Sequence, residues 1–198
     1  DEIIKLYNIK ENNYNIIQTL NYHTDIVNRI IEVGNKYLVS CSDDKSINFY
    51  MKDNNEYIKD YTIKTKDICT SVIQTKDNEI CYSEKMNNSI CFYDLQERKI
   101  KSSISNINKR NDCYERFIMI NKDLLLIPGE NKISIINVNK YNLVRIIDTS
   151  GTGWIFGVCI LNENILLTGD REKKAIRQWK IEGDNLLLIS QKENSHEE

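Results

Sequence analysis

The sequence predicts an all-β protein, a β-propeller of four-stranded antiparallel blades. The first observation is a period of 43 residues at which isoleucine recurs five times in register. The second is that each period divides into four short runs rich in Ile, Val, Tyr and Phe, with turn residues between them. The third is that no segment keeps a 3.6-residue apolar period for three turns, so almost no helix is expected. Four strands per repeat of about 43 residues are typical of propeller blades.

Three columns of apolar residues define the repeat. The isoleucine column comprises Ile4, Ile47, Ile90, Ile133 and Ile176. Three residues later the column comprises Tyr7, Tyr50, Tyr93, Ile136 and Trp179. Ten residues after the isoleucine it comprises Tyr14, Tyr57, Ile100, Leu143 and Leu186. Because equal positions of a repeat face equivalent neighbours, we expect the five isoleucines to fill equivalent buried slots.

The repeat divides the chain into successive units. Residues 1–20 align with the third and fourth strands of a blade and form a half blade. Full blades are expected over 21–64, 65–107, 108–150 and 151–194, and residues 195–198 begin the next unit. About four and a half blades are therefore present. Because a seven-bladed ring at this period needs about 300 residues, we expect the chain to be a piece of a longer protein.

The strands within a unit follow from short apolar runs. In the unit 21–64 the runs are DIVNRIIEV, KYLVSCS, SINFYM and EYIKDYTI, separated by the turn segments GNK, DDK and KDNN. In the next unit they are DICTSVIQT, EICYS, SICFYDL and KIKSSIS. The two later units follow the same order, so each is expected to be an antiparallel meander.

The unit 21–64 resembles a WD40 repeat. HTDIV at 23–27 and YLVSCSDDKSINFY at 37–50 follow the family's order of a histidine, two strands, a turn with aspartate and a third strand. The resemblance implies a hydrogen-bonded structural tetrad of His23, Ser40, Asp44 and Tyr50. The family's Trp-Asp pair is replaced by Tyr50-Met51, Tyr93-Asp94, Ile136-Asn137 and Trp179-Lys180. The later units also lose the histidine and most of the tetrad, so their blades are divergent.

Asp43 and Asp44 could be a carboxylate pair that does chemistry or two residues of a turn. Aspartate is favoured in tight turns because its side chain accepts hydrogen bonds from nearby backbone N–H groups. The corresponding turns of later units read KMNN, GEN and REKK, which supply no converging ligands. We interpret both aspartates as turn residues, with Asp44 also accepting from His23.

Enzymatic signatures are missing from the sequence. It has no nucleophile motif and no paired Cys or His spacing for a metal, and the glycines at 151 and 153 lack the Lys-Ser/Thr of a phosphate loop. A nucleophilic pair of His23 and Cys41 is disfavoured because both belong to the framework of the best-matched blade. The sequence therefore predicts no enzyme, no catalytic or metal-ligating residue, no cofactor and no small-molecule substrate.

Composition restricts the partners and the location. The formal net charge is −2, whereas a dedicated nucleic-acid binder is usually basic. No run of about 18 apolar residues is available to span a membrane. Six cysteines without paired spacing are typical of small buried side chains in a reducing compartment. We expect an intracellular protein, cytoplasmic or cytoskeletal, whose partners are other proteins or peptides within a multiprotein complex.

The resemblance implies that peptides bind the face that carries the connections between blades and the turns between second and third strands. Six residues are candidates for this face: Lys109, Arg110, Trp154, Arg171, Lys173 and Lys174. Trp154 could instead be buried between blades, and the basic residues could be solvated turn charges. The predicted function is a non-catalytic interaction scaffold. The alternatives are a structural subunit of a cytoskeletal or axonemal (ciliary) assembly and, more weakly supported, a nucleic-acid-associated propeller.

Overall fold

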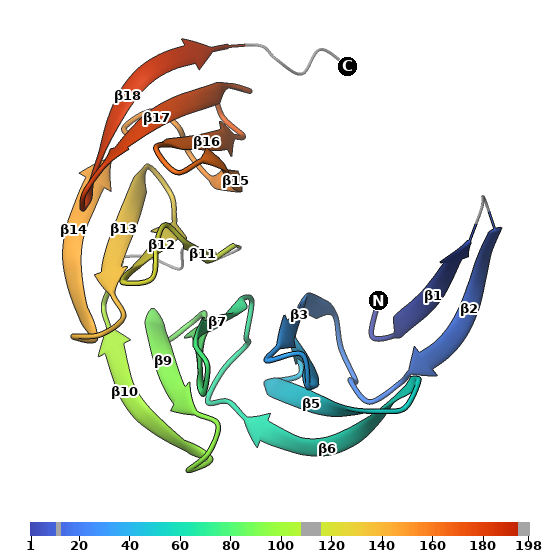
Figure 1. Ribbon diagram of the computed structural model, residues 1–198. Helices are drawn as coiled ribbons and strands as arrows, with labels where there is room; N and C mark the ends of the chain where they lie inside the picture. Colours follow the sequence, from blue (N-terminus) through green and yellow to red (C-terminus); the bar gives the residue numbers. More distant parts are fainter. Residues whose placement is uncertain (11–12, 108–115, 194–198) are drawn as a thin grey trace.

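The computed structural model describes residues 1–10, 13–107 and 116–193. In these ranges the chain forms eighteen strands and no helix, which confirms the all-β prediction. The strands make five antiparallel sheets, one with two strands and four with four. Figure 1 shows the sheets side by side along an open arc, each radiating outward from its concave side. No helix among the described residues could cross a membrane.

The sheets follow one another in chain order. The half blade contains β1 (Ile4–Lys10) and β2 (Asn13–Leu20). The first blade contains β3 (Val27–Val33), β4 (Tyr37–Ser42), β5 (Ser46–Asp53) and β6 (Glu56–Lys64). The second contains β7 (Val72–Lys76), β8 (Glu79–Glu84), β9 (Ser89–Asp94) and β10 (Lys99–Ser105). The third contains β11 (Ile118–Met119), β12 (Leu124–Pro128), β13 (Lys132–Asn137) and β14 (Asn142–Asp148), and the fourth β15 (Ile155–Asn162), β16 (Ile165–Asp170), β17 (Ile176–Glu182) and β18 (Asn185–Lys192).

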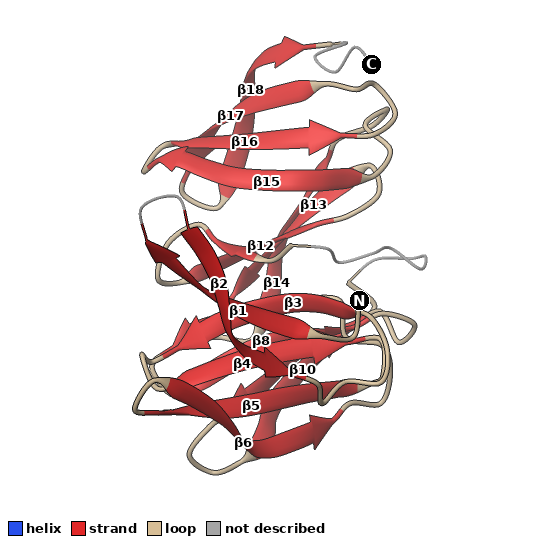
Figure 2. Cartoon of the chain, turned by 90° about the vertical axis from the view of Figure 1, so that its right-hand side faces the viewer, coloured by secondary structure: helices blue, strands red, loops and turns tan. Residues whose placement is uncertain are grey.

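Each full blade is a meander whose strands pair in chain order. The first strand of each blade, from β3 to β15, lies on the concave side of the arc, and the last lies outside (Figure 1). Figure 2 shows the strands running between two faces, where the loops gather. We name one of them the connection face: it holds the connections 21–26, 65–71 and 149–154 and the turns 43–45, 85–88, 129–131 and 171–175. The remaining turns form the opposite face.

The isoleucine column packs neighbouring blades together. Ile47 and Phe49 of the first blade share an apolar cluster with Ile80 of the second. Ile90 occupies the same place between the second and third blades, and Ile133 between the third and fourth. These three isoleucines are fully buried, and Ile4 is buried between the half blade and the first blade. Since a buried isoleucine contributes about 1.5–3 kcal/mol, the column is a main source of cohesion between sheets.

Ile176 departs from the prediction that all five isoleucines are buried. Its side chain is 39% exposed. The reason is that each isoleucine of the column packs against the next blade, and no blade follows β18 among the described residues. Tyr7 is 48% exposed for the mirror-image reason, because its equivalent Tyr50 packs back against the preceding sheet. The column is therefore a property of pairs of blades rather than of one blade.

Candidate functional site

His23 is the centre of a buried polar network in the first blade. It lies in the connection from β2 to β3, at the connection face. His23 Nδ1 lies 2.8 Å from Asp44 Oδ2, and His23 Nε2 lies 2.7 Å from Ser40 Oγ. Ser40 Oγ in turn donates to the Tyr50 hydroxyl at 3.3 Å. The structure thus brings together the four residues that the sequence analysis assigned to a tetrad, across a connection, two strands and a turn.

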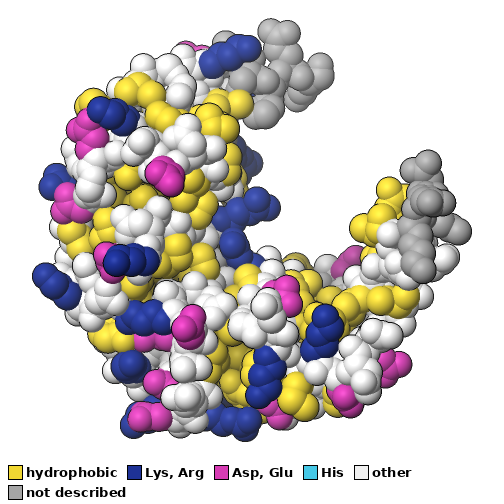
Figure 3. All heavy atoms as spheres, in the orientation of Figure 1, with side chains coloured by type: hydrophobic (Ala, Val, Ile, Leu, Met, Phe, Trp, Pro, Cys, Tyr) yellow, Lys and Arg dark blue, Asp and Glu magenta, His cyan; other side chains and the backbone are white. Residues whose placement is uncertain are grey.

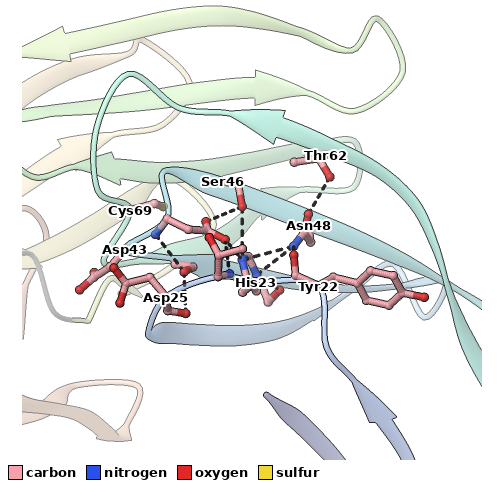
Figure 4. A network of polar contacts seen from close by, with 12 residues as sticks. Tyr22, His23, Asp25, Asp43, Ser46, Asn48, Thr62 and Cys69 are labelled. Carbon is pink, nitrogen blue, oxygen red and sulfur yellow. Dashed lines mark hydrogen bonds and ion pairs between the residues drawn. The ribbon is translucent and has the colours of Figure 1, made fainter. Parts of the chain in front are cut away.

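Three further residues extend this network, and the sequence analysis missed them. Ser46 Oγ donates to Asp44 Oδ1 at 2.5 Å. Asn48 Nδ2 lies 3.2 Å from His23 Nε2, and Asn48 Oδ1 accepts from the Thr62 hydroxyl at 2.6 Å. Figure 4 shows Asn48 between the His23 ring and Thr62 of the next strand. The sequence carried no signal for them, because a polar residue in a strand, such as Ser46 or Asn48 in β5, fits a water-facing position as well as a buried one.

The network lowers the pKa of Asp44. Burial acts in the opposite direction and is the largest single effect, because it disfavours the charged carboxylate. Hydrogen bonds from Ser46, from His23 and from the Thr24 backbone N–H together outweigh it. Asp44 is therefore ionised near neutral pH and holds the connection 21–26 against the turn 43–45.

The order of contacts, Ser40 to His23 to Asp44, is that of a hydrolase triad. A serine nucleophile, however, must reach a substrate carbonyl next to donors that stabilise the oxyanion. Ser40 is 0% exposed and His23 only 3% exposed. Ser40 Oγ is directed to Tyr50 within the blade instead of to a cavity. The arrangement has the proton-transfer contacts of a catalytic site but gives a substrate no access to them.

The later blades keep only parts of this arrangement. In the fourth blade the Trp179 indole N–H donates to Thr168 Oγ1 at 2.9 Å, in the places of Tyr50 and Ser40. A buried ion pair of Arg177 and Asp170 lies beside this bond. In the second blade Ser83 Oγ accepts from the Ser71 N–H at 2.9 Å and so also ties a connection to its blade. The first and second blades thus join their connections to their strands through different polar contacts, whereas these contacts of the fourth blade lie between its own strands β16 and β17.

Three solved structures share this arrangement of sheets. A chain in the crystal structure of a mitotic checkpoint complex has a TM-score of 0.80 and 12% identity, over 97% of this chain and 60% of that one. The WD40 β-propeller domain of Doa1 has a TM-score of 0.71 and 15% identity, over 85% and 55%. The β-propeller domain of Cps50 (Swd1) from Myceliophteria thermophila has a TM-score of 0.73 and 10% identity, over 90% and 63%.

The chain has the WD40 β-propeller fold. It spans between 55% and 63% of the length of these three chains. No protein-family model matches the sequence, and no curated protein is significantly similar to it. The similarity to WD40 propellers is therefore seen in the arrangement of the strands, whereas the amino-acid sequences differ widely.

The candidate partner-binding residues lie on the connection face of this WD40 fold, as far as the structure describes them. Arg171, Lys173 and Lys174 are exposed in the turn between β16 and β17. Trp154 is half-buried at the end of the connection 149–154 and forms an isolated bridge with Glu130. It is therefore neither a fully exposed anchor nor fully buried between blades. Lys109 and Arg110 lie outside the described residues.

The connection 149–154 is held close to two turns of the same face. Asn131 Oδ1 accepts from the N–H groups of Gly151 at 3.1 Å and Gly153 at 2.8 Å. Gly153 has φ +61°, and a Cβ there would collide with the Glu172 side chain, so only glycine fits. A hollow of about 360 Å³ lies among Asn131, Ser150 and Glu172. The turn that carries Arg171, Lys173 and Lys174 thus borders this hollow through Glu172.

The described residues contain no candidate metal site, since no group of three or more His, Cys, Asp or Glu side chains converges among them. Four of the five described cysteines, Cys41, Cys69, Cys81 and Cys91, are buried, and Cys159 is exposed. All five are free thiols. Burial raises the pKa of Cys69 and of Cys81, because desolvation disfavours the thiolate. These buried thiols act as small apolar side chains.

Proposed function

We propose that the chain is part of a non-catalytic WD40-type scaffold that binds other proteins through its connection face. The observation that carries the proposal is the sealed network around His23. Among the residues that the structure describes, the set with catalytic contact geometry is buried inside a blade, while charged side chains are exposed on the connections and turns of the connection face. Such an arrangement favours binding on the rigid rim of a stable sheet over chemistry.

The comparisons support this proposal at the level of the fold. One of the similar structures is part of a mitotic checkpoint complex, so the same arrangement of blades occurs in a protein assembly. For this chain we infer protein or peptide partners within a complex, without a cofactor or a small-molecule substrate. The free cysteines support an intracellular location. Nothing in the described residues or in the comparisons favours a cytoskeletal or a nucleic-acid role over this one.

The test uses two matched double variants of the tagged chain in quantitative affinity capture from cell extract. In Arg171→Glu/Lys173→Glu the charge of the connection face is reversed. In the control Lys36→Glu/Lys140→Glu the same number of exposed charges is reversed on the opposite face. The proposal expects a set of co-purifying proteins that the first variant loses at least tenfold and the control keeps. Equal capture by both variants, or no specific capture, contradicts it.

A further inference from the structure

A cavity of about 410 Å³ opens on the concave side of the arc. Its walls come from the inner strands of all four full blades, β3, β7, β11 and β15, or from the residues next to them, so it lies on the inner wall of the open arc. The residues that matter are Arg29, Ile30, Ile73, Arg116, Phe117 and Val158. Figure 3 shows Lys and Arg side chains, in dark blue, along this concave side.

Two arginines from different blades meet at this cavity. Arg29 lies on β3, and its Nη2 donates to the Phe117 carbonyl at 3.4 Å. Arg116, the residue before Phe117, is exposed, whereas Arg29 is half-buried. The pKa of Arg29 is lowered, first by burial and next by the positive charge of Arg116. The two guanidinium groups therefore repel each other across one cavity.

This repulsion has no counter-charge among the described residues. Three other arginines each pair with an aspartate: Arg98 with Asp60, Arg145 with Asp184 and Arg177 with Asp170. Arg29 and Arg116 form no ion pair with a described carboxylate. Two like charges held together on a partly apolar wall raise the affinity of the cavity for an anion, because the attraction is less screened there than in open water.

The walls and the neighbours of the arginines define the ligand further. Ile30, Ile73 and Val158 are apolar, so they favour the carbon chain of a ligand and not its charge. Asn28 is already occupied: its Nδ2 donates to Asp43 Oδ1 at 2.6 Å and to the Cys69 carbonyl at 3.0 Å. The charged end of a ligand would thus be recognised by the two guanidinium groups.

The charge of the pair favours a phosphate group. A phosphomonoester carries about −1.5 to −2 charges at pH 7 and three acceptor oxygens, which matches two guanidinium forks. A carboxylate neutralises only one of them. Arg29 follows the connection 21–26 and Arg116 precedes β11, so the cavity lies next to the connection face, where an extended peptide can reach it. We propose that Arg29 and Arg116 bind a phosphorylated serine or threonine side chain of a partner peptide. This inference rests on the proposed function.

The experiment measures binding of labelled probes to the full chain by fluorescence anisotropy at fixed salt. The probes are a degenerate peptide pool with one central phosphoserine, the same pool with serine or with glutamate, and a 12-nucleotide single-stranded RNA; inorganic phosphate is the competitor. We expect the phosphoserine pool to bind at least about tenfold more tightly than the other peptide pools, since hydrogen bonds between charged groups are worth that factor or more. Phosphate should displace it.

The variants separate charge from fold. Arg116→Glu should lose at least about tenfold in affinity for the phosphoserine pool, and Arg116→Lys should fall between it and the unchanged chain, because lysine lacks the bidentate fork. Lys140→Glu, with the same change of charge on the opposite face, should bind like the unchanged chain. Melting temperatures show whether each variant is folded. If Arg116→Glu unfolds, Arg116→Gln replaces it.

Several results would overturn the inference. They are equal affinity for the phosphoserine and serine pools, tighter binding of the RNA than of any peptide, binding of inorganic phosphate without any binding of the phosphoserine pool, and a folded Arg116→Glu that binds like the unchanged chain. Each leaves the proposed function intact if proteins are still captured through Arg171 and Lys173. If that capture is lost while phosphoserine binding is retained, only the assignment of partner binding to Arg171 and Lys173 is contradicted.

Discussion

The first and fourth blades have the same four-stranded meander but different polar interiors. The first is organised by His23, which contacts Ser40 and Asp44 and thereby ties the connection 21–26 to the strands. The fourth has no histidine and keeps a single bond from Trp179 to Thr168, beside the ion pair of Arg177 and Asp170. The difference teaches that the blade itself depends on apolar stacking. The tetrad is an additional tie between a connection and its blade.

The two blades also differ in their neighbours. The first blade packs against a sheet on each side, and Ile47 is fully buried. Within the described part of the chain the fourth blade packs against the third only, and Ile176 is exposed together with Phe156, Leu161 and Leu187. A residue at the same place of the repeat therefore contributes differently to stability, according to whether the next blade is present.

The largest effect should come from a charge placed in the isoleucine column. Ile47→Asp is expected to lower the free energy of unfolding by more than about 4 kcal/mol, because an unpaired carboxylate would be buried between two sheets. Ile176→Asp should cost less than about 1 kcal/mol, since water reaches that side chain. Urea denaturation of both variants checks this. Similar losses for the two would show that exposure does not distinguish these slots.

Removing the centre of the network should have the next largest effect. His23→Ala is expected to cost about 2–4 kcal/mol, because it leaves buried partners at Ser40 and Asn48 without their hydrogen bonds. Thr168→Val in the fourth blade removes one bond, to Trp179, and should cost about 1–2 kcal/mol. Thermal unfolding followed by circular dichroism compares them. A cost of Thr168→Val as large as that of His23→Ala would contradict the ranking of the two interiors.

The lowered pKa of Asp44 predicts a pH dependence. The ionised carboxylate stabilises the folded chain fully above its ordinary value of 3.8, and this contribution is lost as the pH falls through the lower folded pKa. The stability gap between the unchanged chain and Asp44→Asn should therefore stay constant from about pH 7 to about pH 5 and narrow below about pH 4. Urea titrations across this range measure the gap. A constant gap would mean that the charge of Asp44 does not contribute.

The smallest effect is expected at the connection face. Lys173→Ala/Lys174→Ala should change the free energy of unfolding by less than about 0.5 kcal/mol, because both side chains are exposed on a turn. A larger loss would show that these lysines belong to the framework of the fourth blade. The melting temperature of the double variant is sufficient to decide.

The sequence predicted the fold because its repeat is carried by residues that pack in every blade. Ile90 and Ile133 stand at the same interval and fill the same slot, so the period alone indicates their surroundings. His23 and Asp44 could be placed from the match to one WD40 repeat. Asn48 and Thr62 could not, since a polar residue within a strand gives no sign of whether it faces water or the blade interior.

Contacts between distant blades were beyond the reach of the sequence. Arg29 contacts Phe117 over 88 positions of chain, and only the curvature of the arc brings them together. The exposure of Ile176 depends in the same way on a neighbour that no local pattern specifies. Periodicity thus describes one blade and its adjacent slot, while the concave side must be taken from the three-dimensional structure.

The most direct test of the sealed network is labelling with a fluorophosphonate, which reacts with activated serines. The network is predicted to be structural, so the folded chain should show no adduct on Ser40 by intact-mass and peptide mass spectrometry, while a trypsin control reacts fully. A stoichiometric adduct on Ser40 that disappears in His23→Ala would contradict this account, because it would prove that a substrate reaches the triad.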